Sequence, residues 1–211
     1  MRYLWLDGVR AIAVVLMIIF HFFYDLSYFG WYQADVSGVS AWLPFRYFII
    51  SLFTLSLGLS LSIVHAKKYQ WKKYSLWLAK VFLAAVLVSV GTSFIFPQNW
   101  VYFGILHFMC VASLLVMLFV KFKVLSFLLG VVIITIYLLT DLHYGWPINY
   151  IQFLFHNNIS EDFVPLFPWA GVALIGSSLT PLLVRSAWLN ALGNLFPKPF
   201  LFLGRHSLII Y

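Results

Sequence analysis

Residues 7–26 read DGVRAIAVVLMIIFHFFYDL, and this run sets the class of the protein. A helix crosses about 30 Å of hydrocarbon with roughly 20 apolar residues, which is the length of this run. The whole chain has the same character, because 64% of its 211 residues are hydrophobic, 20% are aromatic and only 9% are charged. A soluble domain carries about 25% charged residues, and disordered chains have few aromatics. The composition therefore excludes both classes and predicts a membrane protein.

Six stretches have the length and hydropathy of a membrane-spanning helix. They are residues 9–29, 42–64, 76–96, 100–120, 124–140 and 164–184. A seventh begins near Phe200, but its rise before Tyr211 is only about 17 Å, so we expect the sequence to be truncated there. Open sheets are excluded in lipid because their backbone groups stay unpaired. The sequence predicts one all-α, polytopic transmembrane helix bundle over residues 1–211, with six full spans and a partial seventh.

The basic residues predict the orientation of this bundle. If the N-terminus is cytoplasmic, all of the 13 lysines and arginines except Arg46 fall on cytoplasmic segments, as the positive-inside rule requires. The net charge of +7 is therefore a sign of topology and not of nucleic-acid binding. We expect the basic loop 65–75 to touch anionic lipid head groups, with a solvated His65. The prediction is a multi-pass protein of the cell inner membrane.

The ionisable residues of the first span share one side of the helix. At about 100° per residue, Arg10 and His21 fall within about 20° of each other, and Asp7 and Asp25 lie on the same stripe. Such a stripe should line the interior of the bundle or a wet cavity, because charged groups avoid lipid. The alternative is a packing helix with a few satisfied polar groups. Arg10 suits a phosphorylated ligand at the cytoplasmic end, and His21 suits a base nearer the outer end.

Other predicted spans carry polar groups at a matching depth. His107 lies about 10 Å and His21 about 12 Å from the outer ends of their spans, and Asp25 and Arg46 are each about one turn deep. Arg46 is interpreted either as a snorkelling interfacial side chain or as a functional cation. No metal-ligand spacing is present, so no metal site is predicted. Glycines inside the spans should mark close contacts between helices, namely Gly58, Gly91 and Gly176.

The segment 7–26 resembles the first-span motif of the heparan-alpha-glucosaminide N-acetyltransferase catalytic-domain family. YFGILHFMCVASLL (102–115), PLFPWAGVALIG (165–176) and FLGRHSLIIY (202–211) resemble that family in the same order. The spacing of Arg10 and His21 is also similar to that of the large membrane acyltransferase family that O-acetylates surface polysaccharides. The resemblance implies a membrane acyltransferase. It would move an acyl group, in the first place acetyl, from cytoplasmic acetyl-CoA or another acyl-CoA to a sugar or glycan acceptor outside.

The resemblance also implies roles for individual residues. His21 is expected to act as the base or as a transient acyl acceptor, with Asp25 orienting it or pairing with Arg46. His107, in the Gly-Ile-Leu-His motif, would be a second polar group for the acceptor or the thioester. The other expected contacts are with the CoA phosphates, through Arg10, Arg205 and His206, and with the acceptor, through Asp162 and Trp169.

Two other functional classes stay open at this stage. A proton-coupled small-solute transporter would also place His and Asp inside the bundle, although the repeated halves common in transporters are absent. An inactive fragment or scaffold would explain the short last helix. Binding of labelled acyl-CoA separates the enzyme from the transporter, because a transporter has no reason to bind the donor.

Overall fold

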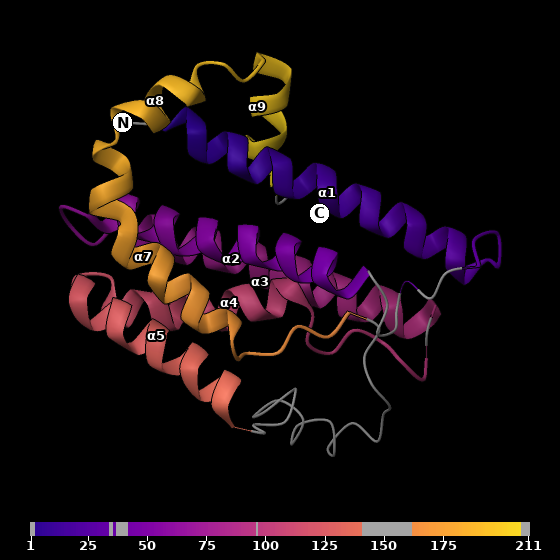
Figure 1. Ribbon diagram of the computed structural model, residues 1–211. Helices are drawn as coiled ribbons and strands as arrows, with labels where there is room; N and C mark the ends of the chain where they lie inside the picture. The colour runs from indigo at the N-terminus through magenta and orange to yellow at the C-terminus, as the bar shows by residue number, and fades with distance from the viewer. Residues whose placement is uncertain (1–2, 34–35, 37–41, 96, 141–161, 208–211) are drawn as a thin grey trace. The chain divides into compact units, whose positions relative to one another are not determined.

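In the computed structural model, residues 3–33, 36, 42–95, 97–140 and 162–207 are described, and all regular structure among them is helical. The all-α prediction is therefore confirmed for this part of the chain. Figure 1 shows the order of the helices along the sequence. The chain divides into two compact units. Unit 1 comprises Met1–Ser56 and Pro181–Tyr211, and unit 2 comprises Leu57–Thr180.

Unit 1 is built on α1 (Leu4–Tyr28), with α8 (Ala187–Gly193) and α9 (Lys198–Arg205) packed along its N-terminal half (Figure 1). Ser186 caps α8 by accepting a hydrogen bond from the Leu189 amide at 3.4 Å. Glycine allows the close approach of α9, because a Cβ atom at Gly204 would lie 1.9 Å from the Asp7 carbonyl oxygen. The last described helix is thus docked on the first.

Aromatic rings join α1 to the first part of α2 (Trp42–His65) at the other end of unit 1. The Phe23 and Trp42 ring centroids are 5.0 Å apart, and those of Phe20 and Trp42 are 6.3 Å apart. Aromatic pairs at such distances contribute packing energy beyond their buried area. Phe20 of this cluster also meets the His21 ring edge-on, with 5.8 Å between the centroids.

Unit 2 contains the rest of α2, α3 (Trp71–Ile95), α4 (Ile105–Phe119), α5 (Lys123–Leu139) and most of α7 (Trp169–Arg185). Small residues form its helix crossings, as is typical of apolar helices that pack in lipid. A Cβ atom at Gly58 would lie 1.9 Å from the Ala173 carbonyl oxygen, so the predicted contact at Gly58 is confirmed. The same prediction is wrong at Gly91, where such an atom would meet nothing within 4 Å.

The helix lengths do not support six full spans and a partial seventh within the described residues. Three helices, α1, α2 and α3, are long and apolar enough to cross a membrane, and α7 with α8 would be a fourth across a bend of 89°. The predicted fourth and fifth spans contain helices of only 15 and 17 residues. The predicted sixth span is helical only from Trp169, because Pro165 and Pro168 precede it and proline has no N–H for a helix interior.

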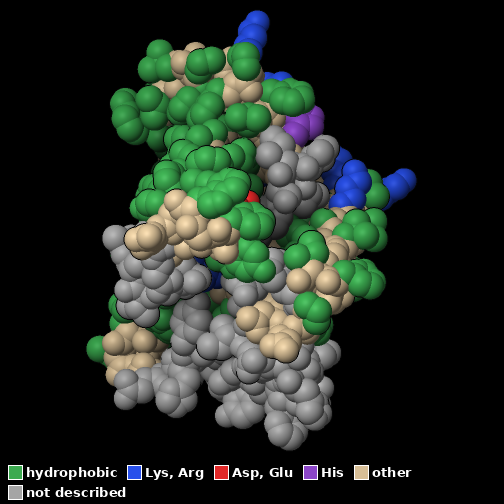
Figure 2. Space-filling model, turned by 90° about the vertical axis from the view of Figure 1, so that its right-hand side faces the viewer, with side chains coloured by type: hydrophobic (Ala, Val, Ile, Leu, Met, Phe, Trp, Pro, Cys, Tyr) green, Lys and Arg blue, Asp and Glu red, His purple; other side chains and the backbone are tan. Residues whose placement is uncertain are grey.

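Much of the described surface is apolar. On the face in Figure 2, hydrophobic side chains dominate the described atoms. Only 11% of the most apolar 18-residue stretch of α3 is buried, and Phe94 on that helix is 81% exposed. Soluble monomers do not expose apolar patches of this extent to water. The exposed faces therefore support contact with lipid.

Candidate functional site

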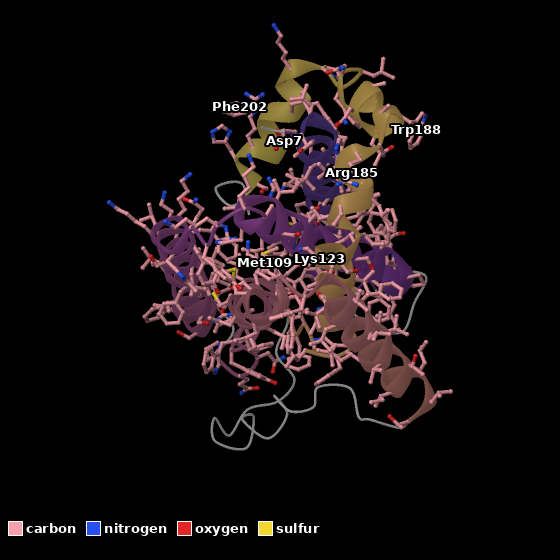
Figure 3. The ribbon with its side chains drawn as sticks, turned by 90° about the vertical axis from the view of Figure 1, so that its left-hand side faces the viewer. Asp7, Met109, Lys123, Arg185, Trp188 and Phe202 are labelled. Carbon is pink, nitrogen blue, oxygen red and sulfur yellow. The ribbon has the colours of Figure 1, made fainter. Side chains whose placement is uncertain are left out.

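Two arginines from opposite ends of the chain share one buried carboxylate in unit 1. Asp7, in the first turn of α1, has a side chain that is only 5% exposed. Its Oδ1 lies 3.6 Å from Arg10 Nη1, and its Oδ2 lies 3.8 Å from Arg205 Nε. Figure 3 labels Asp7 on α1 beside α9. Of these three side chains, two are positively charged and one is negatively charged.

Local structure explains how this ion cluster forms. Residues three apart face the same side of a helix, so Asp7 and Arg10 meet within α1. The close contact at Gly204 brings the next residue, Arg205, against the same turn. The two arginines that we predicted to bind phosphate are therefore brought together. The prediction missed the role of Asp7, although its spacing from Arg10 was a usable signal.

His206 follows α9 directly and is held by its own helix. Its Nδ1 donates to the Phe202 carbonyl oxygen at 3.0 Å, and the two rings lie 4.1 Å apart between centroids. Because Nδ1 carries the proton in this bond, Nε2 is the acceptor nitrogen of the neutral ring. A role of His206 in donor binding stays a prediction.

His21 and Asp25 lie on the C-terminal half of α1, and both are exposed. No hydrogen bond or ion pair joins their side chains, and the His21 ring meets Phe20 edge-on at 5.8 Å. Arg46 is half-buried on α2. The predicted stripe is therefore buried at Asp7 and exposed at its two outer residues. The catalytic roles of His21, Asp25 and Arg46 stay predictions.

In unit 2, both ring nitrogens of His107 are engaged by neighbours. The Gly104 amide donates to Nδ1 at 3.3 Å, so that nitrogen carries no proton. Ser89 Oγ lies 3.0 Å from Nε2 and gives its own single proton to the Val101 carbonyl oxygen at 2.7 Å. Nε2–H must then be the donor to Ser89. The pair is oriented to hold the loop before α4 and not to deprotonate the serine.

The segment before α7 lies against this same loop. A Cβ atom at Gly104 would be 2.9 Å from Asp162 Oδ2, and the Val164 amide donates to the Phe103 carbonyl oxygen at 3.2 Å. The structure thus brings the predicted residues Asp162 and His107 to one loop. Trp169 begins α7 and is only 6% exposed.

The opposite end of unit 2 holds a polar cluster that the prediction missed. We expected His65 to be solvated, which is wrong, because it ends α2 with only 1% exposure and donates from Nδ1 to the Leu61 carbonyl oxygen at 2.8 Å. Lys123 Nζ donates to the Ser62 hydroxyl and, at 3.2 Å, to the Ser177 carbonyl oxygen. Basic side chains near the C-terminus of a helix bind its unpaired carbonyl groups. The position of His65 in the last turn of α2 was therefore a signal that it bonds to its own helix. Hydropathy alone did not show that α2 packs as far as its last residue.

Comparison with known sequence families matches residues 2–211 to the family described as heparan-alpha-glucosaminide N-acetyltransferase, catalytic. No curated protein and no solved structure matches the chain. The family match covers essentially the whole chain and agrees with the apolar helices. It indicates an enzyme of the acetyltransferase type in a membrane. The chain belongs to the heparan-alpha-glucosaminide N-acetyltransferase catalytic family.

Proposed function

We propose that this protein transfers acetyl groups from cytoplasmic acetyl-CoA to an amino or hydroxyl group of a sugar or glycan on the outer side of the cell inner membrane. The family match supports the reaction type. The observation that carries the proposal is the convergence of Arg10 and Arg205 on Asp7. Two guanidinium groups held together suit the phosphates of CoA, because guanidinium binds phosphate in a fixed fork.

The proposed topology keeps the N-terminus in the cytoplasm and has six crossings and a partial seventh within one domain. The distribution of lysine and arginine supports it. Within unit 2, Lys121 Nζ donates to the Ala66 carbonyl oxygen at 2.9 Å. The turn between α4 and α5 therefore lies beside the basic loop after α2, as two cytoplasmic connections would. In this topology α4 and α5 also cross the membrane.

In the proposed reaction, the acceptor nitrogen or oxygen attacks the thioester carbonyl carbon. A C–N or C–O bond forms, the C–S bond breaks, and the electron pair of that bond leaves with the CoA sulfur. His21 takes the proton from the acceptor and returns it to the thiolate, which leaves CoA as the thiol. Asp25 stabilises the charged imidazole, and Arg46 supplies a cation for the carbonyl oxygen as it becomes negative.

Residues of unit 2 are proposed to bind the acceptor. Asp162 supplies a carboxylate for sugar hydroxyl or amino groups, and Trp169 supplies an apolar ring face. His107 holds the loop before α4, against which the segment with Asp162 lies, through its bonds to Gly104 and Ser89. His107 is therefore expected to affect acceptor binding more than the proton transfer.

The test is acetyl transfer by protein reconstituted in liposomes, with radiolabelled acetyl-CoA as donor and glucosamine as the acceptor probe. His21→Ala should lower the transfer rate about 10²- to 10⁴-fold, because that is the usual contribution of a general base. Its Kd for acetyl-CoA should stay within about twofold of the wild type. Phe22→Ala is the matched control, since Phe22 is the next residue and is 58% exposed.

Two results would contradict the proposal. Full transfer by His21→Ala, with the control also active, would remove His21 from the mechanism. A wild-type protein that inserts normally but does not bind acetyl-CoA would exclude the acetyltransferase and leave the proton-coupled transporter or the inactive scaffold.

A further inference from the structure

We infer that one end of unit 2 binds the phosphate of an anionic phospholipid, between the connection from α2 to α3 and the turn from α4 to α5. Its cations form a lysine surface, which comprises Lys67, Lys68, Lys72, Lys73, Lys121 and Lys123. The sequence predicts only that the loop 65–75 touches head groups, whereas here a second connection completes a defined lipid site. This site is independent of the acetyl-transfer reaction.

Lys121 joins the two connections. Its Nζ donates to the Ala66 carbonyl oxygen at 2.9 Å and lies 5.3 Å from the centroid of the Tyr69 ring. An ammonium group has three N–H donors, and within the described residues this carbonyl takes one of them. Segments 55 residues apart in the sequence thus form one surface, and the charge of Lys121 is added to that of the loop.

Ring contacts fix the loop before any lipid binds. His65, at the end of α2, is only 1% exposed, and its ring centroid lies 6.1 Å from that of Tyr69 and 6.1 Å from that of Tyr74. Tyr69 also stacks on Trp71, with 5.2 Å between the centroids and 15° between the ring planes. The loop is therefore held against the ends of α2 and α3, and a fixed loop loses little conformational freedom on binding.

Charge complementarity selects an anionic partner for this surface. Residues 36–140, which include every member of the lysine surface, contain seven lysines and one arginine but no aspartate or glutamate. The lysines therefore have no carboxylate on the helices and connections that carry them. The four loop lysines are exposed, and Lys123 is half-buried where it donates to Ser62 and Ser177. A phosphodiester supplies the negative charge that these segments lack.

Apolar side chains beside the lysines favour a lipid over a soluble phosphate. Trp71 and Phe122 are each 60% exposed. Phe122 lies between Lys121 and Lys123 in the turn, and Trp71 directly precedes Lys72. Lysines next to exposed aromatic rings are typical of the membrane interface, where the ammonium groups meet the head groups and the rings lie at the level of the acyl-chain boundary. A soluble phosphate would leave these rings in water.

The test is native mass spectrometry of protein in a neutral detergent, with phosphatidylglycerol and the zwitterionic phosphatidylcholine as probes. The wild type should bind phosphatidylglycerol with a Kd about tenfold or more below that for phosphatidylcholine, because each lysine near an anionic head group adds attraction. Lys72→Gln/Lys121→Gln should raise the Kd for phosphatidylglycerol about tenfold, and the Kd for phosphatidylcholine should stay within about twofold. Lys72→Arg/Lys121→Arg keeps both charges and should bind as the wild type does.

Two further variants make this result specific. Lys80→Gln/Lys198→Gln is the matched control, because Lys80 lies about 12 Å beyond Lys72 along α3, further than the screening length of about 8 Å, and Lys198 belongs to α9 in unit 1. Its Kd for phosphatidylglycerol should stay within about twofold of the wild type. Lys68→Gln/Lys72→Gln leaves the Lys121 bond to Ala66 intact and should still weaken phosphatidylglycerol binding, so the test does not depend on the fold of one variant.

Three results would overturn the lipid site. The first is an unchanged Kd for phosphatidylglycerol in both glutamine variants of the lysine surface. The second is an equal loss of binding in the matched control, which would indicate general attraction to a basic protein. The third is displacement of phosphatidylglycerol from the wild type by acetyl-CoA or inorganic phosphate, which would show that the surface takes a soluble phosphate instead.

Discussion

The role of a polar side chain in this protein depends on which of its atoms are already occupied. From the sequence, His107 is expected to be a second polar group for the acceptor or the thioester, but both of its ring nitrogens are bonded, and the Ser89 proton goes to a carbonyl oxygen. Asp7 looks like one member of a polar stripe, but its two carboxylate oxygens face arginines from two helices. In both cases the sequence identified the polar side chain but not the groups that it contacts.

The Ser89–His107 bond leads to a prediction at this scale. Ser89→Ala removes the acceptor for His107 Nε2–H, and we expect a loss of about 1 kcal/mol in the free energy of unfolding. Ser93→Ala, one turn further along α3, should change it by less than about 0.5 kcal/mol, because that exposed hydroxyl bonds only to its own helix. Unfolding in mixed micelles with increasing SDS measures both variants, and equal losses would contradict the assigned hydrogen bond.

At the scale of helices, small residues decide where the backbones meet. Gly58 packs on the backbone of α7 at Ala173, and Gly130 of α5 packs on Gly171 of the same helix. Gly91 sits in an equally apolar helix but meets nothing. A glycine in a hydrophobic span is therefore a candidate contact, and only the neighbouring helix decides whether the contact exists.

Gly58→Ala and Gly91→Ala form a matched pair of predictions for the helices. The added methyl at Gly58 would overlap a backbone carbonyl, which cannot move unless α2 and α7 separate, so we expect a loss of about 1–3 kcal/mol in stability. At Gly91 the same change should be neutral or stabilise α3 by up to about 1 kcal/mol, since alanine favours helix over glycine. The same SDS unfolding experiment measures both. A stable Gly58→Ala variant would show that the packing of α2 on α7 is wrong.

At the scale of the whole molecule, charge predicts orientation. Of the 13 basic residues, all except Arg2 and Arg46 lie in described segments that the proposed topology makes cytoplasmic. The mean hydropathy of +0.97 indicates a membrane protein. The distribution of lysine and arginine then predicts which side of the membrane each connecting segment faces. The apolar surface of α3 and the family match agree with the membrane location.

Cysteine labelling tests this orientation. In a Cys110→Ser background, Lys68→Cys should react with a membrane-impermeant maleimide only after cells are permeabilised, whereas Gln98→Cys should react in intact cells. The two positions follow α2 and α3 respectively, so one span separates them. Labelling of Lys68→Cys in intact cells would reverse the proposed topology.

The sequence by itself determined the helical class, the apolar character and the family, because hydropathy and motifs are properties of a stretch of chain. It also selected Arg10 from its residue type, and Arg205 from the family resemblance, as candidates for phosphate binding. Where helices begin and end was less predictable: prolines before Trp169 shorten α7, and packing buries His65 where a solvated loop was expected.

Only the tertiary structure decided that Asp7 lies between Arg10 and Arg205, since this depends on α9 reaching α1 across most of the chain. It also decided the hydrogen-bond partners of His107 and the contact at Gly58. The physical reason is that apolar burial has no direction, so many pairings of apolar helices bury similar area. Ion pairs, hydrogen bonds and close glycine contacts are directional and short-ranged, and they exist only once one of those pairings has formed.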